Sequence, residues 1–232
     1  MLDFHTHLLP GVDDGSDSVT TSLGMLSRWS AEDCVCATPH FYADRDTPER
    51  FLRRRAAAWD ALSAALPEAV PRIRLGAEVR YFAGMASAEV LPRLCLEGTR
   101  LLLLEFPFVP WTERMLEEVR RIRRRGIQPV AAHLERYLGF NRPETLRAFL
   151  EEELLVQCNA EFFLSHRTRR KALRLLQDGF IQFLGSDAHN LGDRAPNLAQ
   201  ALELIAEKLG AQEAKVIDEE AQYWLRRCAV EE

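Results

Sequence analysis

The chain has few cysteines, and none of them form a paired motif. Its five cysteines are Cys34, Cys36, Cys95, Cys158 and Cys228, an odd set in which no two have the C-x-x-C spacing. Such a set suits a reducing compartment rather than a disulfide framework. We therefore expect a cytoplasmic protein.

Long apolar runs and an excess of basic charge are also absent. The longest strand-like apolar run, Leu101–Leu104, is far shorter than a membrane span. The N-terminus has no charged segment followed by an apolar one, so we expect no cleaved signal. The net charge of −5 argues against a general nucleic-acid binder, whose surface would be basic.

What the chain does contain is enough apolar residues for one large core. They make up 47% of 232 residues, and seven short, continuous apolar segments are typical of buried parallel strands. The segments are Leu2–His5, Cys34–Thr38, Ile73–Glu78, Leu101–Glu105, Gln128–His133, Leu154–Cys158 and Ile181–Gly185. Helical patterns separate them, which predicts βα units and an α/β barrel. With no linker or repeat, we expect a single domain over residues 1–232.

Histidines and acids occur at or just past the downstream ends of these segments. Five of the six histidines are placed this way, and His166 is the exception, which we interpret as a surface or capping residue. The residues at strand ends are His5, His7, His40, Glu78, Glu105, His133, Asp187 and His189. Side chains of this kind from many strands predict a metal cluster at the C-terminal mouth of the barrel. The chain is therefore a hydrolase candidate.

Two of these motifs support each other. His5 and His7 end the first strand, and Asp187 and His189 follow the seventh. Side chains at i and i+2 of a strand share a face, and the last strand of a closed barrel neighbours the first. Asp3 extends the same face and is a candidate hydrogen-bond acceptor for a ligating imidazole. A buried Glu105 also needs a partner, either a metal or an arginine.

The order of these motifs resembles a known family. The strings that carry the resemblance are Asp3-Phe4-His5-Thr6-His7, Pro10-Gly11-Val12-Asp13-Asp14-Gly15, Ala37-Thr38-Pro39-His40, Gly76-Ala77-Glu78-Val79-Arg80, Glu105-Phe106-Pro107, His133-Leu134-Glu135-Arg136 and Gly185-Ser186-Asp187-Ala188-His189-Asn190. They resemble the PHP (polymerase and histidinol phosphatase) superfamily. Within it they are most similar to the bacterial manganese-dependent protein-tyrosine phosphatases of capsule and exopolysaccharide operons, the CpsB/YwqE type.

The resemblance implies a distorted seven-stranded (β/α)7 PHP barrel with three divalent metal ions, Mn²⁺ first and Fe or Zn as alternatives. One ion would take His5, His7, Glu78 and Asp187, with Glu78 bridging to a second ion that adds Glu105 and His133. The third would take Asp14, His40 and His189, although the adjacent Asp13 remains an alternative to Asp14. Arg136 and Arg194 match positions expected to contact phosphate, and rim salt bridges are the other interpretation.

The implied reaction is attack by a metal-activated hydroxide on phosphotyrosine, with a bacterial tyrosine autokinase as the expected protein substrate. A thiol mechanism would need C-x5-R, and the nearest approach, Cys95 and Arg100, is one residue short. The alternatives are a histidinol-phosphate phosphatase or other small-molecule phosphomonoesterase, and a non-catalytic metal-binding regulatory barrel. Relatives tend toward a small stretch where this chain has Asn159–Leu164, so that segment is expected to reshape the substrate rim.

Overall fold

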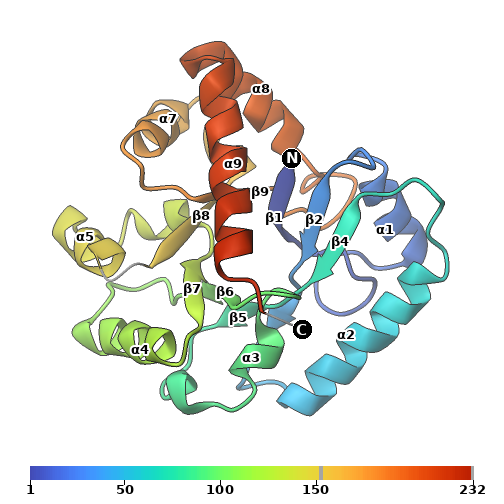
Figure 1. Cartoon of the computed structure of the whole chain (residues 1–232), viewed down its shortest axis with the longest axis horizontal. Helices are drawn as coiled ribbons and strands as arrows, with labels where there is room; N and C mark the ends of the chain where they lie inside the picture. The colour runs from blue at the N-terminus through green and yellow to red at the C-terminus, as the bar shows by residue number, and fades with distance from the viewer. Residues whose placement is uncertain (152–153, 231–232) are drawn as a thin grey trace.

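The computed structural model describes residues 1–151 and 154–230, in which short strands lie at the centre of the molecule (Figure 1). The strands are β1 (Leu2–Thr6), β2 (Cys34–Ala37), β3 (His40–Phe41), β4 (Arg72–Leu75), β5 (Glu78–Arg80), β6 (Leu101–Glu105), β7 (Gln128–Ala131), β8 (Leu155–Asn159) and β9 (Phe183–Gly185). They form a three-stranded sheet, β1-β2-β4, and a six-stranded sheet, β3-β5-β6-β7-β8-β9. All neighbouring strands are parallel, as the sequence predicted.

Backbone hydrogen bonds connect the first strand to the segment that follows the last one. The Asp187 N–H donates to the His5 carbonyl at 2.8 Å, and the His7 N–H donates to the Ala188 carbonyl at 2.8 Å. The two parallel sheets therefore curl toward each other as a partial barrel, with a mixed α/β fold.

The prediction of seven uninterrupted strands was wrong at two places. The expected strand Cys34–Thr38 is present as β2, but Pro39, which has no N–H for the ladder, separates it from a further short strand, β3, that the sequence did not predict. The expected strand Ile73–Glu78 is divided at Gly76, where an added Cβ would lie 3.3 Å from Cγ2 of Thr38. Both breaks occur where the two strands run side by side. As a result, His40 and Glu78 become register partners in the second sheet.

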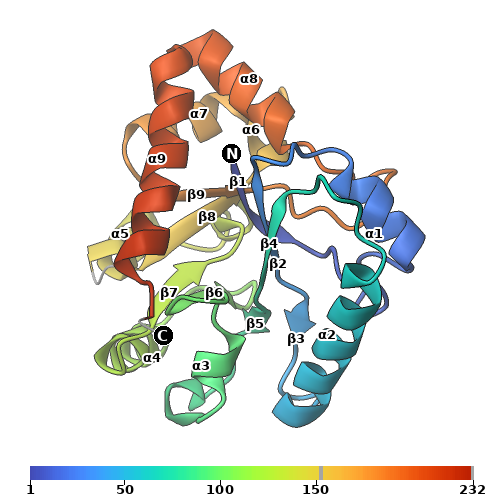
Figure 2. The same cartoon turned by 45° about the vertical axis from the view of Figure 1, so that its right-hand side comes forward.

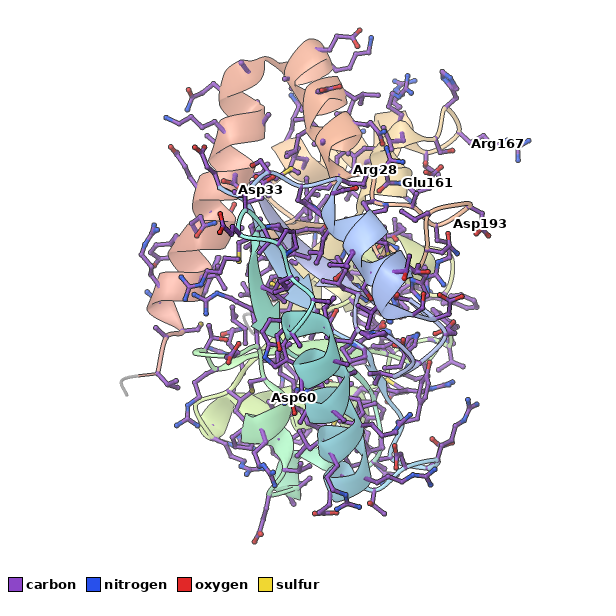
Figure 3. The ribbon with its side chains drawn as sticks, turned by 90° about the vertical axis from the view of Figure 1, so that its right-hand side faces the viewer. Arg28, Asp33, Asp60, Glu161, Arg167 and Asp193 are labelled. Atoms are coloured by element: carbon purple, nitrogen blue, oxygen red, sulfur yellow. The ribbon has the colours of Figure 1, made fainter. Side chains whose placement is uncertain are left out.

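Helices surround the strands on the outside of the molecule (Figure 2). They are α1 (Val19–Leu26), α2 (Pro48–Ser63), α3 (Leu91–Leu94), α4 (Glu113–Arg124), α5 (Pro143–Glu151), α6 (Ala160–Leu164), α7 (Arg169–Gln177), α8 (Leu198–Leu209) and α9 (Ala211–Arg227), with 3₁₀ turns η1 (Met85–Ser87) and η2 (Leu134–Tyr137). On α2, Asp60 points outward into solvent (Figure 3). Among the described residues, a helix with the length and apolar character of a membrane span is not found.

Local sequence explains why these helices start and which face they bury. The Thr47 side chain accepts a hydrogen bond from the Arg50 N–H at 3.3 Å, and Pro48 occupies the first turn of α2. In α4, Met115, Val119 and Ile122 recur at helical spacing and are buried. These faces pack on the outer side of the sheets, in the larger of two apolar clusters.

The last helix holds the upstream end of the barrel. Asp218 of α9 accepts a hydrogen bond from the Leu2 N–H at 2.7 Å, and Leu225 packs in a second apolar cluster with Leu101 and Leu103. The Arg100 N–H donates to the carbonyl of Cys228, just after α9, at 2.7 Å. Helix α9 thus contacts the end of the strands opposite to the histidines.

We expect Gly185→Ala to destabilise the protein by about 1–3 kcal/mol, the usual cost of overpacking. A Cβ at Gly185 would lie 2.6 Å from Cβ of His5 and 3.0 Å from its backbone nitrogen. Gly139→Ala is the matched control, since no atom lies within 4 Å of a Cβ there. Urea unfolding of both variants measures the difference, and equal stability would contradict the close contact between β9 and β1.

Candidate metal centre

Nine side chains that the sequence analysis assigned to metal lie together at the downstream ends of the strands. They are His5, His7, Asp14, His40, Glu78, Glu105, His133, Asp187 and His189. Apart from Asp14, their side chains are at most 14% exposed. Burying this many polar groups is costly unless they hold one another or a cation. His166, expected at the surface, is exposed.

Glu78 is at the centre of this group. Its Oε2 lies 3.1 Å from Nε2 of His5 and 3.3 Å from Nε2 of His7. The same oxygen is 3.0 Å from Nδ1 of His40, and Oε1 is 2.8 Å from Nε2 of His133. Burial alone would raise the pKa of Glu78, but the surrounding imidazoles hold it well below its usual value. A carboxylate with both oxygens directed at separate histidines has the arrangement of a bridging ligand.

Three groups of side chains offer donor atoms close enough for one cation each. The groups are His7, Asp14, His40 and His189; His5, His7 and Asp187; and His40, Glu78 and Glu105. Within each group the donor atoms lie within 4.8 Å of one another. His133 joins the third group through Glu78 and through Glu105, whose Oε1 is 3.8 Å from its Nε2. These groups overlap the three ligand sets expected from the sequence, but His7 and His40 each belong to two groups. In addition, Glu78 is grouped with His40 and Glu105 and not with the first expected set.

The protonation of the imidazoles differs across the centre. Burial lowers the pKa of His133, and it lowers that of His189 to about 4. Burial also opposes charge on His5 and His7, but neighbouring carboxylates raise the pKa of both, chiefly Glu78 at His5 and Asp13 at His7. A cation has to displace any proton on these rings, so metal binding at His5 and His7 releases protons.

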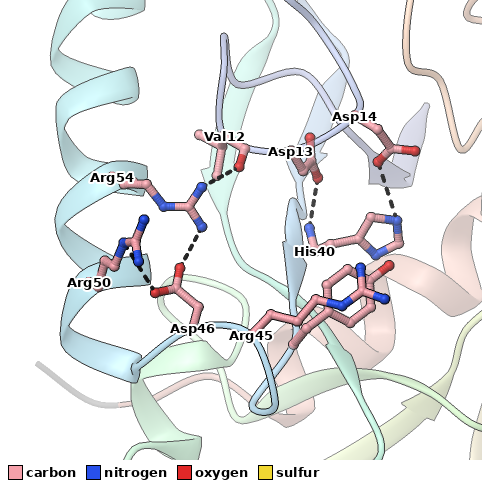
Figure 4. A pocket seen from close by; sticks show the side chains of 9 residues that line it. Val12, Asp13, Asp14, His40, Arg45, Asp46, Arg50 and Arg54 are labelled. Carbon is pink, nitrogen blue, oxygen red and sulfur yellow. Dashed lines mark hydrogen bonds and ion pairs between the residues drawn. The ribbon is translucent and has the colours of Figure 1, made fainter.

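The structure separates the roles of Asp13 and Asp14. The Asp13 side chain is 7% exposed, and its Oδ2 accepts hydrogen bonds from Nδ1 of His7 and from the His40 N–H, both at 2.7 Å. Figure 4 shows the contact with the His40 N–H. Although burial opposes it, the His7 contact holds the pKa of Asp13 far below its usual value. Asp14 is 66% exposed, with Oδ1 3.6 Å from Nε2 of His40 and 3.7 Å from Nε2 of His189. Asp13 therefore orients an imidazole, and Asp14 directs an exposed carboxylate toward two of the other imidazoles.

Asp3 does not have the role expected from the sequence. Its Oδ1 accepts from the backbone N–H of Ser186 at 2.9 Å and of His5 at 3.3 Å, rather than from an imidazole. Burial raises the pKa of Asp3 to about 6. The side chain thus connects β1 to the turn after β9, because the bend in the chain brings amides rather than a ring nitrogen to its oxygens.

Two residues that contact the ligands were not identified from the sequence. Oε1 of Gln157 accepts from the His133 N–H at 2.8 Å and lies 3.1 Å from Nδ1 of His5. Its Nε2 donates to Asn159 at 2.9 Å, and Asn159 donates to Oδ2 of Asp187 at 2.9 Å. A hydrogen on Nδ1 of His5 leaves Nε2 free to bind a cation. In the sequence, the signal that could have identified them is a pair of amide side chains in an otherwise apolar strand, Leu155–Asn159.

Arg136 and Arg194 converge on the outer side of the same carboxylate. Nη2 of Arg136 lies 2.8 Å, and Nη2 of Arg194 3.0 Å, from Oδ2 of Asp187. Both arginines line a pocket of about 410 Å³ together with Glu161 and Phe162. Glu161 and Phe162 belong to α6, so the segment expected to reshape the substrate rim includes a short helix that lines this pocket. The ion pairs to Asp187 match the interpretation of both arginines as rim salt bridges. The pocket beside them leaves room for the other interpretation, contact with phosphate.

We expect Gln157→Leu to weaken Mn²⁺ binding about 10- to 100-fold, the usual effect of removing a group that orients a ligand. The substitution removes the acceptor for Nδ1 of His5 and for the His133 N–H. Gln177→Leu, at the exposed end of α7, is the control. Calorimetric titration with Mn²⁺ gives the affinities, and circular dichroism checks the fold. If the variant folds and binds Mn²⁺ with the parent affinity, Gln157 does not orient a metal ligand.

Comparison with known proteins agrees with this geometry. A family model described as capsular polysaccharide synthesis, CpsB/CapC, matches residues 1–225. The chain is similar to the tyrosine-protein phosphatase CpsB of Streptococcus agalactiae serotype V, with 26% identity over 92% of this chain and 93% of the relative. It is also similar to the tyrosine-protein phosphatase YwqE of Bacillus subtilis strain 168, with 28% identity over 99% of this chain and 93% of the relative.

A solved structure extends the similarity to three dimensions. It comes from work on YwqE from Bacillus subtilis and CpsB from Streptococcus pneumoniae, described as unique metal-dependent tyrosine phosphatases. The superposition gives a TM-score of 0.81 at 25% identity, and covers all of this chain and 96% of the other. The chain belongs to the CpsB/CapC family of capsular polysaccharide synthesis proteins.

Proposed function

We propose that this chain is a metal-dependent tyrosine phosphatase of capsular or exopolysaccharide synthesis, working as one domain over residues 1–232. The observation that carries the proposal is the convergence of nine imidazole and carboxylate side chains around Glu78. The relatives named as tyrosine-protein phosphatases, and a structural neighbour described as metal-dependent, support the same chemistry.

The donor atoms suit three divalent cations, with Mn²⁺ first and Fe or Zn as alternatives. Imidazole nitrogens and carboxylate oxygens are ligands that all three metals accept. Oε2 of the buried Glu105 has no hydrogen-bond partner within the described residues, and neither does Nε2 of His189, so both have free donor capacity. We assign His5, His7, Glu78 and Asp187 to one cation, Glu105 and His133 with Glu78 to the second, and Asp14, His40 and His189 to the third. When bound, the cations lower the pKa of water to about 7 and neutralise phosphate charge.

Arg136 and Arg194 hold the phosphoryl oxygens. Their side chains are 39% and 37% exposed, so both reach the pocket while an ion pair to Asp187 fixes their position. A guanidinium offers paired N–H donors that match two phosphate oxygens. The leaving phenolate has an ordinary pKa of about 10, so it departs more readily than an alkoxide and needs less help from an acid.

An exposed aromatic surface beside the centre favours tyrosine over serine. The Phe108 ring is 40% exposed, and its centroid lies 6.3 Å from that of His133 and 5.7 Å from that of Tyr137. Phe140, 47% exposed, lies 6.5 Å from Phe108. These rings give a phenyl group an apolar face to pack on, which a phosphoserine side chain would leave uncovered.

The cellular setting and the alternatives follow from the same proposal. A tyrosine autokinase in the cytoplasm is the proposed protein substrate, and we propose no nucleic-acid partner. A histidinol-phosphate phosphatase would use the same metal chemistry on a charged small molecule, and the Phe108 surface favours a neutral ring instead. A non-catalytic regulatory barrel is disfavoured because the nine ligand positions all carry residues able to bind metal.

The proposal predicts strictly metal-dependent hydrolysis of phosphotyrosine. With Mn²⁺, the protein should hydrolyse phosphotyrosine peptides faster than phosphoserine peptides, histidinol phosphate or nucleotides. Excess chelator should abolish turnover and added Mn²⁺ should restore it, while thiol alkylation should have little effect, because no cysteine is among the nine ligands. Phosphate release measures each rate. Full activity in chelator, or a preference for histidinol phosphate, would contradict the proposal.

Removing either arginine should weaken phosphate binding without removing metal. Loss of one charge-assisted contact costs about 1.5–3 kcal/mol, so Arg136→Ala or Arg194→Ala should lower kcat/KM roughly 10- to 100-fold. The lysine variants should recover only part of this, because a point charge lacks the paired donors. Metal content by mass spectrometry should match the parent, and Arg226→Ala on α9 is the remote control. If both alanine variants hydrolyse phosphotyrosine peptide at the parent rate, Arg136 and Arg194 do not bind phosphate, and their role is limited to ion pairs at the pocket rim.

A further inference from the structure

A second pocket, of about 460 Å³, opens beside Asp14 and His40, and the phosphatase mechanism does not use it (Figure 4). Three arginines line it, Arg45, Arg50 and Arg54. The pocket also shares Asp14 and His40 with the metal centre. A group bound there would therefore lie next to the reacting phosphate.

Two of the three arginines are occupied by the protein itself. Arg54 of α2 donates to the Val12 carbonyl at 2.7 Å and to Oδ2 of Asp46 at 2.6 Å. Nε of Arg50 lies 3.7 Å from Oδ1 of Asp46. These contacts hold the loop that carries Asp13 and Asp14 against α2. They also use the Asp46 carboxylate, so it is not available to other cations.

Arg45 is different, and it contacts the ring of Tyr42, as does Arg80 of β5. Their guanidinium carbons lie 4.9 Å and 5.5 Å from the centroid of the Tyr42 ring. Both side chains are exposed, and within residues 1–151 and 154–230 neither makes a side-chain hydrogen bond or an ion pair. The Tyr42 ring in turn stacks on His40, with centroids 4.9 Å apart and an interplanar angle of 25°. Two uncommitted cations thus flank an aromatic ring that contacts a metal-centre histidine.

Three acids near this ring already have contacts within the protein. Asp13 accepts from His7, Asp14 faces His40 and His189, and Asp46 holds Arg54. Glu105 is the register partner of Arg80, and the Arg80 charge lowers the pKa of Glu105, but no ion pair within 4.0 Å joins Arg45 or Arg80 to a carboxylate among the described residues. Two guanidinium groups over one ring attract an anion, and their planar donors match either a carboxylate or a phosphate.

We propose that the Tyr42 arginine pair, Arg45 and Arg80, binds an anionic side chain of the substrate polypeptide a few residues from the reacting phosphotyrosine. This inference rests on the proposed function. The Tyr42 ring centroid lies 4.9 Å from that of His40. The guanidinium carbons of the two arginines lie 4.9 Å and 5.5 Å from the same Tyr42 centroid. An extended peptide advances about 3.3–3.6 Å per residue, so a side chain two or three residues from the phosphotyrosine spans this distance. The pair is a specificity element for acidic or multiply phosphorylated segments.

The test compares peptides that differ only in flanking charge. Each carries a non-hydrolysable phosphonate analogue of phosphotyrosine, flanked two residues away on both sides by alanine, glutamate or phosphoserine. Fluorescence anisotropy gives Kd for the Mn²⁺-loaded protein at low salt. The parent should bind the glutamate peptide about fivefold tighter than the alanine peptide, the upper range for exposed ion pairs, and the phosphoserine peptide tighter still.

In the double variant Arg45→Ala/Arg80→Ala, both ratios should fall close to one. The matched control, Arg72→Ala/Arg226→Ala, removes two exposed charges at the upstream end of β4 and on α9, and should keep the parent ratios. Equal binding of all three peptides by the parent, or the same loss in the control variant, would overturn the proposal. A gain with phosphoserine alone would support it and identify the ligand as phosphate.

The binding ratios and the enzyme assay report separately. If the hydrolysable forms of these peptides are not turned over, the proposed phosphatase function fails, while the Kd ratios still test the arginine pair. If they are turned over at rates that ignore the flanking charge, and the Kd ratios are also one, only the inference about Arg45 and Arg80 fails.

Discussion

The functional end of this molecule depends on one buried carboxylate, Glu78, held by four imidazoles from different strands or strand ends. Its two oxygens lie 2.8–3.3 Å from ring nitrogens of His5, His7, His40 and His133. A carboxylate buried to 1% exposure is stable only with compensating charge or donors, and those neighbours provide it. The breaks at Pro39, between β2 and β3, and at Gly76, between β4 and β5, make the contact to His40 possible, because they place His40 opposite Glu78 in the second sheet.

The strands themselves carry little strain, but the turns that follow two of them do. His133 has φ of 35° and Asp187 has φ of 52°, in the left-handed region that residues with a Cβ avoid. Each such residue costs of order 1–3 kcal/mol. At His133 the N–H bond to Gln157 offsets this cost, and at Asp187 the bonds from Asn159 and the N–H bond to the His5 carbonyl do so. The amides between β7, β8 and β9 therefore stabilise a geometry that the backbone alone would not adopt.

The sequence was enough to predict the strand ends, because a histidine or acid after a short apolar run is a local pattern. It correctly indicated the α/β class, the parallel pairing and the meeting of His5 and His7 with Asp187. What it missed depends on neighbours that are distant in the chain. The role of Asp3 follows from the amide of Ser186, and that of Gln157 from His133 and His5. Asp13 and Asp14 could be told apart only by which carboxylate the folded loop turns toward His7.

Asp187 connects the two halves of the proposed chemistry. Its Oδ1 lies 3.4 Å from Nε2 of His7 and 3.6 Å from Nε2 of His5, on the metal side. Its Oδ2 accepts from Asn159 and from both Arg136 and Arg194, on the phosphate side. Because the same carboxylate contacts both sides, a shift of Asp187 toward a cation would change its ion pairs with Arg136 and Arg194. The arginines are thereby positioned before substrate arrives, so little of the binding energy is needed to order them. The uncommitted Arg45 and Arg80 lack such an anchor and remain available to a ligand from outside the chain.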